Sequence, residues 1–321
     1  MTNSFKYTLD NKRYHTWNYH LFKKFGEKVF KVSLNAGFTC PNIDGTKGVG
    51  GCIYCSGEGS GDFAGNPCED ILTQFEKVKE RMHKKWQKAK YIPYFQAHTN
   101  TYAPLEVLKE KFEPVLCEEG VVGLSVATRA DCLSDEVCDY LLELSKRTYL
   151  IVELGLQTVH DKTGELINRC HTFLEFLQGY KKLSDRGINV CVHLIVGLPG
   201  ETKEMMLKSV AETVKLKPHA IKLHLLHILK GTPIAAMYER GEFSALSREE
   251  YVDIIVDALE IIPEEIIIQR LTGDGARDSL VAPLWSLKKF CVLNEIDKEM
   301  VRRNTYQGRL YNRKTSHNDA V

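Results

Sequence analysis

An apolar strand pattern runs directly into a helical pattern in residues 188–216, INVCVHLIVGLPGETKEMMLKSVAETVKL. The segment 188–199 is apolar and β-branched, and after a Pro-Gly turn the segment 202–216 has the spacing of an amphipathic helix. Five other apolar runs recur at intervals of roughly 30 residues, the length that a strand followed by a helix requires. These runs are 29–35, 91–97, 121–129, 148–157 and 220–229. We therefore expect a chain of repeated strand–helix units.

The helical segments between these runs begin and end at suitable residues. Pro104 and Ser134 stand where helices are expected to start, and Gly187 follows a helix as a C-terminal glycine does. Six units in parallel order imply either a doubly wound sheet or a (β/α) barrel. Functional-looking residues follow nearly every strand, and barrels carry their active sites at that end, so we expect a barrel. The expected helices lie near 68–89, 104–118, 134–147, 172–186 and 202–216.

Only six units are clear, so we expect an α/β fold with a partial (β/α)6 TIM-like barrel rather than a closed barrel of eight units. One further strand is expected within 264–275, with helices near 247–261 and 284–303. We divide the chain into three parts and expect the last to be an α/β extension that covers the barrel and contacts substrate. The parts are an N-terminal extension (1–28), the core barrel (29–230) and the C-terminal extension (231–321).

The composition is typical of a soluble globular protein. The 321 residues are 43% hydrophobic and 26% charged, with a formal net charge of +1, so a nucleic-acid partner would need a local patch. No apolar run approaches the roughly 20 residues of a membrane helix, and the polar, aromatic N-terminus lacks a signal-peptide core. We expect a cytoplasmic protein with no membrane and no DNA partner.

Three cysteines share one glycine-rich loop, FTCPNIDGTKGVGGCIYCSGEGSGDF, in residues 38–63. Eleven residues separate Cys40 from Cys52, and two separate Cys52 from Cys55. Three thiolates can hold a zinc ion when a histidine supplies the fourth ligand. They can also hold three irons of a four-iron cluster and leave the fourth iron open. Glycines let the backbone wrap an anionic cluster closely, but the loop alone leaves both alternatives open. The glycines are Gly48, Gly50, Gly51, Gly57, Gly59 and Gly61.

The loop resembles the cluster motif of the radical S-adenosylmethionine (SAM) enzymes. Most of these carry C-x3-C-x2-C with an aromatic residue before the third cysteine, and Tyr54 holds that place here. A longer first gap also occurs in the catalytic subunit of elongator, a tRNA wobble-uridine enzyme. The resemblance implies that the three cysteines bind a [4Fe-4S] cluster, that SAM binds its open iron, and that Tyr54 lies beside them.

The resemblance covers residues 29–230 and points to one branch of the superfamily. That branch holds elongator, oxygen-independent coproporphyrinogen oxidase and the methylthiotransferases. Within it, the chain resembles the bacterial radical SAM proteins of the YhcC/YtqA type, and there the likeness extends to the C-terminus.

Two further motifs carry the resemblance. VELGLQT (152–158) followed by INRCHT (167–172) is similar to the family's pairing of a strand-end glutamine with an arginine twelve residues later, and HLIVGLPGET (193–202) is similar to its fifth strand. These motifs imply that Gln157 binds the ribose of SAM and that Arg169 binds its carboxylate, with which a guanidinium pairs bidentately. The other implied SAM contacts are His193, Ile195, Gly197, Arg129 and Glu153.

The resemblance implies a reductive cleavage of SAM. An external flavodoxin- or ferredoxin-like reductant supplies one electron, and the products are methionine and a 5′-deoxyadenosyl radical that abstracts hydrogen from substrate. The chain departs from the family pattern at two positions. Ala127 stands where relatives carry glutamate, and Cys170 replaces the glycine of their R-G-H turn.

Two basic segments with interleaved aromatic residues suit an RNA partner: 74–91, which contains Trp86, and 298–314. Each is equally compatible with a solvated helix face or a polar tail. Together with the elongator-like branch they favour a tRNA-modifying enzyme that acts on a wobble-uridine side chain. The alternatives are radical chemistry on a small molecule, such as a tetrapyrrole-like or metabolic substrate, and a non-catalytic, zinc-bound RNA-binding protein.

Polar residues at the strand ends are candidates for catalysis. His98 follows the second strand, and the glycine-bracketed loop TGDGARD (272–278) presents Asp274 and Arg277 after a buried strand. Such groups can position substrate or pass a proton. Weaker candidates at the same ends are Gln96, Asn100, Tyr102, His224 and His227.

Overall fold

The computed structural model describes residues 5–57, 59, 64–84, 86, 88–275 and 277–311. Gly61, two residues of the first basic segment (85 and 87) and residues 312–314 of the second lie outside these ranges. The chain divides into two compact units, which we describe one at a time. Unit 1 comprises residues 1–20, 157–164 and 192–321, and unit 2 comprises residues 21–156 and 165–191.

The main sheet has seven strands in the order β1-β2-β3-β4-β5-β6-β8. Each of the first six overlaps one of the six apolar runs, and β8 is the further strand expected within 264–275. The bounds are β1 Val29–Leu34, β2 Lys90–Phe95, β3 Gly123–Thr128, β4 Tyr149–Gln157, β5 Asn189–Val196, β6 Ala220–Leu225 and β8 Ile267–Arg270. In unit 2, β1 pairs with β2, β2 with β3 and β3 with β4, all parallel, and in unit 1 β6 pairs with β8 in the same sense. The parallel α/β class expected from the sequence is confirmed.

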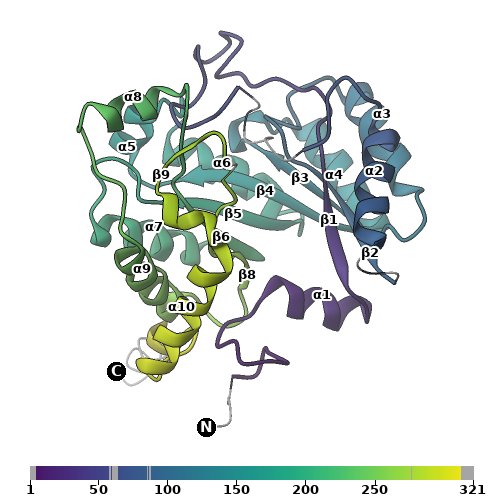
Figure 1. The fold of residues 1–321 in the computed structure, drawn as a ribbon. Helices are drawn as coiled ribbons and strands as arrows, with labels where there is room; N and C mark the ends of the chain where they lie inside the picture. Colours follow the sequence, from purple (N-terminus) through teal and green to yellow (C-terminus); the bar gives the residue numbers. More distant parts are fainter. Residues whose placement is uncertain are drawn as a thin grey trace, which may run out of the picture. The chain divides into compact units, whose positions relative to one another are not determined.

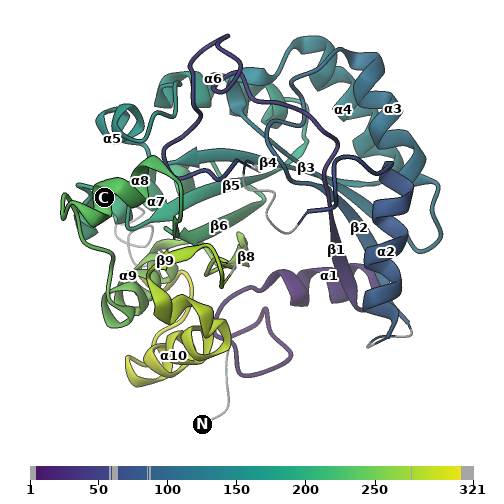
Figure 2. The ribbon, with the colours of Figure 1, turned by 45° about the horizontal axis from the view of Figure 1, so that its top comes forward.

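Helices α2, α3 and α4 of unit 2 lie along strands β1 to β3 in both views (Figures 1 and 2). Their starts follow the expected chemistry: Pro104 precedes α3, and the Ser134 hydroxyl accepts a hydrogen bond from the Val137 amide at 3.2 Å at the start of α4. Thr172 forms a capping box with Glu175 before α6. The bounds are α2 Ile71–His83, α3 Leu105–Leu116, α4 Asp135–Arg147 and α6 Phe173–Ser184, with a 3-10 turn η1 at Ala130–Cys132.

Unit 1 carries the C-terminal helices. Helices α9 and α10 pack together in both views (Figures 1 and 2), and Arg303 joins them through ion pairs with Asp253 and Asp257. The helix expected over 284–303 is a 3-10 turn followed by α10, because Lys288 has a non-helical backbone (φ −97°, ψ 55°). The bounds are α7 Lys203–Lys215, α8 Pro233–Glu239, α9 Arg248–Ile261, η2 Leu284–Leu287 and α10 Lys289–Arg302.

Some elements were not expected from the sequence. The run 220–229 is not one strand, because β6 ends at Leu225 and a short strand β7 (Ile228–Leu229) pairs antiparallel with β9 (Leu280–Ala282). Two short helices were also not expected: α1 (Trp17–Phe25) and α5 (Asp161–Leu166). Over the described ranges, no helix has the length and apolarity needed to span a bilayer.

Candidate active site

The cysteine loop follows β1 in unit 2 and is held in tight turns. The carbonyl of Cys40 accepts hydrogen bonds from the amides of Ile43 (2.8 Å) and Asp44 (3.2 Å), and the Cys55 amide donates to the Cys52 carbonyl at 3.0 Å. All three cysteines are half-buried free thiols. Two adjacent glycines, Gly50 (φ 78°) and Gly51 (φ 74°), take left-handed backbone conformations just before Cys52. Because side chains disfavour that conformation, these glycines are what lets the loop turn back toward its third thiol.

The loop is fastened to the segment that follows α5. The Ile53 amide donates to the Ile167 carbonyl at 3.1 Å, and the Asn168 side-chain amide donates to the carbonyls of Gly51 (2.7 Å) and Val49 (3.2 Å). The Asn42 side chain donates in return to the Asn168 carbonyl. The cysteines and Arg169 therefore belong to one hydrogen-bonded assembly, although more than a hundred residues separate them in the sequence.

The environment of Cys52 favours the thiolate. A hydrogen bond with Cys55 is the main cause that lowers the pKa of Cys52 to about 6, and Tyr54, Arg129 and Asn42 act in the same direction against the effect of burial. The Asn42 side-chain nitrogen lies 3.6 Å from the Cys52 sulfur. Burial raises the pKa of Tyr54, and the neighbouring thiolates add to that shift. Since the thiolate is the form that binds metal, this loop is suited to ligation.

The residues of the loop fit a thiolate-ligated cluster. Ser56 Oγ, one residue after Cys55, is buried without a hydrogen-bond partner among the described residues, and its hydroxyl can donate to the sulfur of a cluster. Gly48 allows a close approach of the loop to its neighbours, because a Cβ there would lie 2.7 Å from the Cys170 sulfur. In the part of the chain that the structure describes, no three His, Cys, Asp or Glu side chains converge as ligands of a single metal ion.

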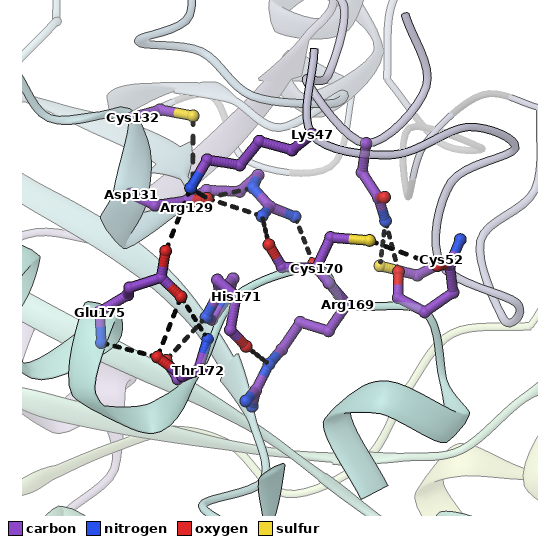
Figure 3. A network of polar contacts seen from close by, with 12 residues as sticks. Lys47, Cys52, Arg129, Asp131, Cys132, Arg169, Cys170, His171, Thr172 and Glu175 are labelled. Carbon is purple, nitrogen blue, oxygen red and sulfur yellow. Dashed lines mark hydrogen bonds and ion pairs between the residues drawn. The ribbon is translucent and has the colours of Figure 1, made fainter. Parts of the chain in front are cut away.

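Arg129 positions the turn that carries Arg169 (Figure 3). Its Nη1 donates to the Arg169 carbonyl at 2.8 Å and its Nη2 to the Cys170 carbonyl at 3.4 Å. The same guanidinium forms a bidentate pair with Asp131, at 2.9 and 2.8 Å, and Lys47 Nζ lies 2.9 Å from that carboxylate. Burial opposes both charges, but the pair raises the pKa of Arg129 and lowers that of Asp131 to about 2. The strand end after β3 thus fixes the backbone after α5.

Arg169 is buried and strongly oriented. Its Nε donates to the His171 carbonyl at 2.8 Å and its Nη1 to the Leu156 carbonyl at 2.7 Å. The residues on either side, Asn168 (φ 53°) and Cys170 (φ 57°), both have left-handed backbones. Non-glycine residues held in this conformation cluster at functional sites. The left-handed backbone at position 170 explains why relatives carry glycine there, and Cys170 adopts the same conformation here.

Glu153 lies on β4 inside a buried charged cluster. It pairs with Lys31 of β1 and accepts a hydrogen bond from Ser125 Oγ of β3 at 2.6 Å. Lys31 Nζ also lies 3.2 Å from Ser125 Oγ and 4.5 Å from the centre of the Tyr94 ring. Sequence reasoning missed this cluster, although a lysine within the apolar run VFKVSL was a signal for it.

His98 lies in unit 2, whereas the SAM-contact candidates Gln157, His193, Ile195 and Gly197 lie in unit 1. His98 has a left-handed backbone (φ 57°) after β2, and its amide donates to the Gly59 carbonyl at 3.0 Å. Gln157, the last residue of β4, is also left-handed (φ 63°). The ring of His193 on β5 lies 5.4 Å from that of His224 on β6. Gly197 follows β5 with φ 95°, and Ile195 is half-buried within that strand.

Asp274 is held by two cations. It pairs with Arg270 of β8, and Lys289 Nζ lies 2.9 Å from its Oδ1. Burial opposes ionisation, but these cations lower the pKa of Asp274 below its ordinary value. Arg277 is exposed. The sequence placed Asp274 in a functional loop, but the two cations that fix it come from β8 and α10.

Comparison with known proteins defines the class. Residues 45–212 match the Radical SAM superfamily, and residues 218–302 match the Radical_SAM C-terminal domain. The chain belongs to the radical SAM superfamily. Enzymes of this superfamily use a [4Fe-4S] cluster and SAM and take an electron from an external reductant.

Individual relatives place the chain more closely within the superfamily. The chain is 55% identical to YtqA of Bacillus subtilis (strain 168) over 311 residues, 97% of each chain, and 37% identical to YhcC of Escherichia coli (strain K12), covering 87% of this chain and 89% of YhcC. A tRNA uridine(34) acetyltransferase of Methanocaldococcus jannaschii is 31% identical over 160 residues, which are 49% of this chain and 29% of that protein. The expected branch of the superfamily is confirmed.

Solved structures agree on the fold. The archaeal Elp3 of Methanocaldococcus infernus superimposes with a TM-score of 0.66 at 20% identity, over 88% of this chain and 64% of that one. Methylornithine synthase (PylB) superimposes with a TM-score of 0.51 at 12% identity, over 93% of this chain and 89% of that one. The partial TIM-like barrel expected from the sequence is therefore confirmed.

Proposed function

We propose that this radical SAM enzyme modifies tRNA, and that its target is the side chain of a wobble uridine. The observation that carries the proposal is the 31% identity to the tRNA uridine(34) acetyltransferase, which falls on about half of this chain. The acetyltransferase is more than three times as long as the region it shares, so its own activity is not transferred here. What is carried over is the substrate class, an RNA uridine.

In this proposal the unit 2 loop holds the cofactors. Cys40, Cys52 and Cys55 would ligate the [4Fe-4S] cluster, with Tyr54 beside it. When bound, the cluster and SAM supply the radical that abstracts hydrogen. Arg169 would meet the SAM carboxylate, and Arg129 holds the Arg169 backbone in place through the carbonyl contacts at 2.8 and 3.4 Å. Preorganised donors of this kind avoid reorganisation when the ligand binds.

The remaining cofactor contacts come from strand ends. Gln157 would meet the ribose, with His193 beside it, and the backbone at Ile195 and Gly197 would lie against the adenine. Glu153 is already engaged by Lys31 and Ser125, so its part would be to keep the buried end of the strands charged and ordered. Asp274, Arg277 and His98 are proposed to act on substrate, with Asp274 oriented by Arg270 and Lys289.

RNA contact would come from the two basic segments. Trp86 is 50% exposed beyond α2 and offers a stacking surface for an unpaired base. On α10, Lys298 and Arg302 line a groove with residues of α9. Acidic neighbours neutralise part of this surface, since Arg302 pairs with Glu299 at 2.6 Å. The proposal therefore relies on aromatic stacking and on a few cations rather than on a broad positive field.

Bulk tRNA nucleosides test the proposal. A strain that lacks the gene should lose one modified uridine, and the wild-type gene should restore it. Cys52→Ala should fail to restore it, whereas Cys117→Ala, at an exposed thiol after α3, should restore it fully. An unchanged nucleoside profile in the deletion strain would refute the tRNA proposal and favour radical chemistry on a small molecule.

A further inference from the structure

Three residues of unit 1, one after β6 and two on β8, carry buried polar atoms without partners in the part of the chain that the structure describes. His227 Nε2, Gln269 Nε2, Gln269 Oε1 and Arg270 Nε are all buried with no hydrogen-bond partner among the described residues. Buried polar atoms in folded proteins are nearly always hydrogen-bonded, so a group of four that are not calls for an explanation. The cofactor contacts proposed above use none of these three residues.

Gln269 and Arg270 lie at an irregularity in the pairing of β6 with β8. Ile221 of β6 pairs with Ile268 of β8, but the next residue, Lys222, pairs with Arg270, so Gln269 is one residue too many. A bulge of this kind re-aims a side chain and is common beside active sites. His227 follows the carboxyl end of β6, which is the end of the strands where barrels carry their sites.

The loop after β8 packs on His227. A Cβ at Gly273 would lie 2.9 Å from His227 Nδ1 and closer still to Cε1, so only glycine fits there. His227 also interacts electrostatically with Arg270 and Asp274. The imidazole is therefore held between the end of β6 and the loop that the sequence singled out as functional.

Two cations, Arg270 and Lys289, face the single carboxylate of Asp274 at this place, and the partnerless groups act through hydrogen bonds. Asp274 engages Arg270, and Lys289 Nζ lies 2.9 and 3.2 Å from its two oxygens. Burial, followed by the charge of Arg270, lowers the pKa of His227 to about 4, so the imidazole is neutral at physiological pH. The partnerless set is an amide with one donor and one acceptor, a neutral imidazole and one guanidinium N–H.

This set selects the chemistry of the ligand. An anion would satisfy the donors but would face the Gln269 carbonyl oxygen, which cannot donate. Rotating the amide by 180° exchanges its oxygen and nitrogen but still leaves one donor beside one acceptor. The complement is a planar edge on which a donor lies between two acceptors. Uracil presents that edge through O4, N3–H and O2, whereas cytosine presents one donor followed by two acceptors.

We propose that Gln269, with Arg270 Nε and His227, binds the Watson–Crick edge of an uracil base that has been unstacked from its RNA. The inference rests on the proposed function and names the residues that would recognise its substrate. The Gln269 carbonyl oxygen accepts a hydrogen bond from N3–H, and the Gln269 nitrogen donates to O4. Arg270 Nε or His227 donates to O2. The base must leave its stack to reach a buried edge, as in other enzymes that do chemistry on a single base.

The test is a binding comparison with two RNAs. Fluorescein-labelled 17-nucleotide anticodon stem–loops that differ only in U or C at the first anticodon position are titrated with the full chain, and fluorescence anisotropy is measured. A bidentate base contact discriminates by about 1–3 kcal/mol, so the U loop should bind about 5- to 150-fold more tightly. Gln269→Leu, which keeps the size but removes both polar atoms, should bring that ratio close to one. Gln178→Leu, on the exposed face of α6, should leave it unchanged.

The outcomes separate this inference from the proposed function. If neither loop binds the wild-type chain, the tRNA proposal fails and this inference fails with it. If both loops bind equally well, or if Gln269→Leu keeps the wild-type ratio, RNA binding stands and the uracil site is wrong. The comparison of the U and C loops on the wild-type chain needs no variant. It can therefore overturn the inference even if Gln269→Leu does not fold. Gln269→Glu gives a second check, because it keeps an acceptor, loses the donor and should also reduce the ratio.

Discussion

Removing the Arg129 guanidinium should be among the most damaging single changes in unit 2. The Arg129 side chain is 10% exposed and its partner Asp131 is 4% exposed, so Arg129→Met would leave a carboxylate buried without its bidentate partner. Breaking a buried pair in this way costs about 3–5 kcal/mol. Lys47 remains 2.9 Å from Asp131 and compensates in part, so we expect a loss near the lower end, about 3 kcal/mol. At about 2 °C per kcal/mol for a chain of this size, the unfolding midpoint should fall by about 6 °C.

A second substitution separates the two roles of Arg129. In the double variant Arg129→Met/Asp131→Asn the unpaired Asp131 carboxylate is removed, so more than half of the lost stability should return. The carbonyls of Arg169 and Cys170 still lack their donor, so SAM binding should remain weaker than in the wild-type chain. Differential scanning calorimetry and SAM titration, at matched iron content, measure the two effects. A midpoint shift below 2 °C for the single variant, or a double variant no more stable than the single one, would refute this reasoning.

Two further predictions concern the site in unit 1. Gly273→Ala should destabilise the chain by about 1–3 kcal/mol, because its Cβ would overlap the His227 ring. The control Gly57→Ala, where a Cβ meets nothing within 4 Å, should change the unfolding midpoint little. Equal effects of the two substitutions on the midpoint would contradict this packing. Burial lowers the pKa of His227 to about 4, below its unfolded value of about 6.5, so its contribution to stability is complete above pH 6.5 and is lost as the pH falls toward 4. As the pH falls over this interval, the unfolding midpoint of His227→Phe should therefore fall less than that of the wild type. The control His83→Phe, at an exposed histidine, should follow the wild type. Parallel curves of midpoint against pH for all three proteins would contradict the buried neutral imidazole.

The sequence was sufficient for the order of strands and helices because each strand–helix unit is encoded locally. Ser134, placed from its position before an amphipathic segment, does cap α4 through its hydroxyl. The break between β6 and β7 was missed, because the apolar run 220–229 continues through it and only the pairing of β7 with β9 reveals it. Local pattern cannot encode which distant strand a residue will meet.

The same limit explains why only part of the candidate site could be predicted from the sequence. The three cysteines stand out because their spacing is local, but the partners of the polar residues are not. Lys31 and Glu153 are 122 positions apart, and Arg129 reaches carbonyls 40 and 41 positions away. The sequence suggested SAM contacts for Arg129 and Glu153, but it could not show that backbone carbonyls and an internal ion pair also engage these side chains. Gln269 carried no sequence signal, since only the register shift against β6 makes it exceptional.

The central claim is that three cysteines of one loop hold a [4Fe-4S] cluster. The most direct measurement is iron, sulfide and zinc per chain in anaerobically purified protein, together with the visible absorption spectrum. We predict brown protein with about four irons and four sulfides per chain, lost in Cys40→Ala, Cys52→Ala and Cys55→Ala and kept in Cys117→Ala. Colourless protein with one zinc and no iron, or iron retained in all three loop variants, would contradict the account.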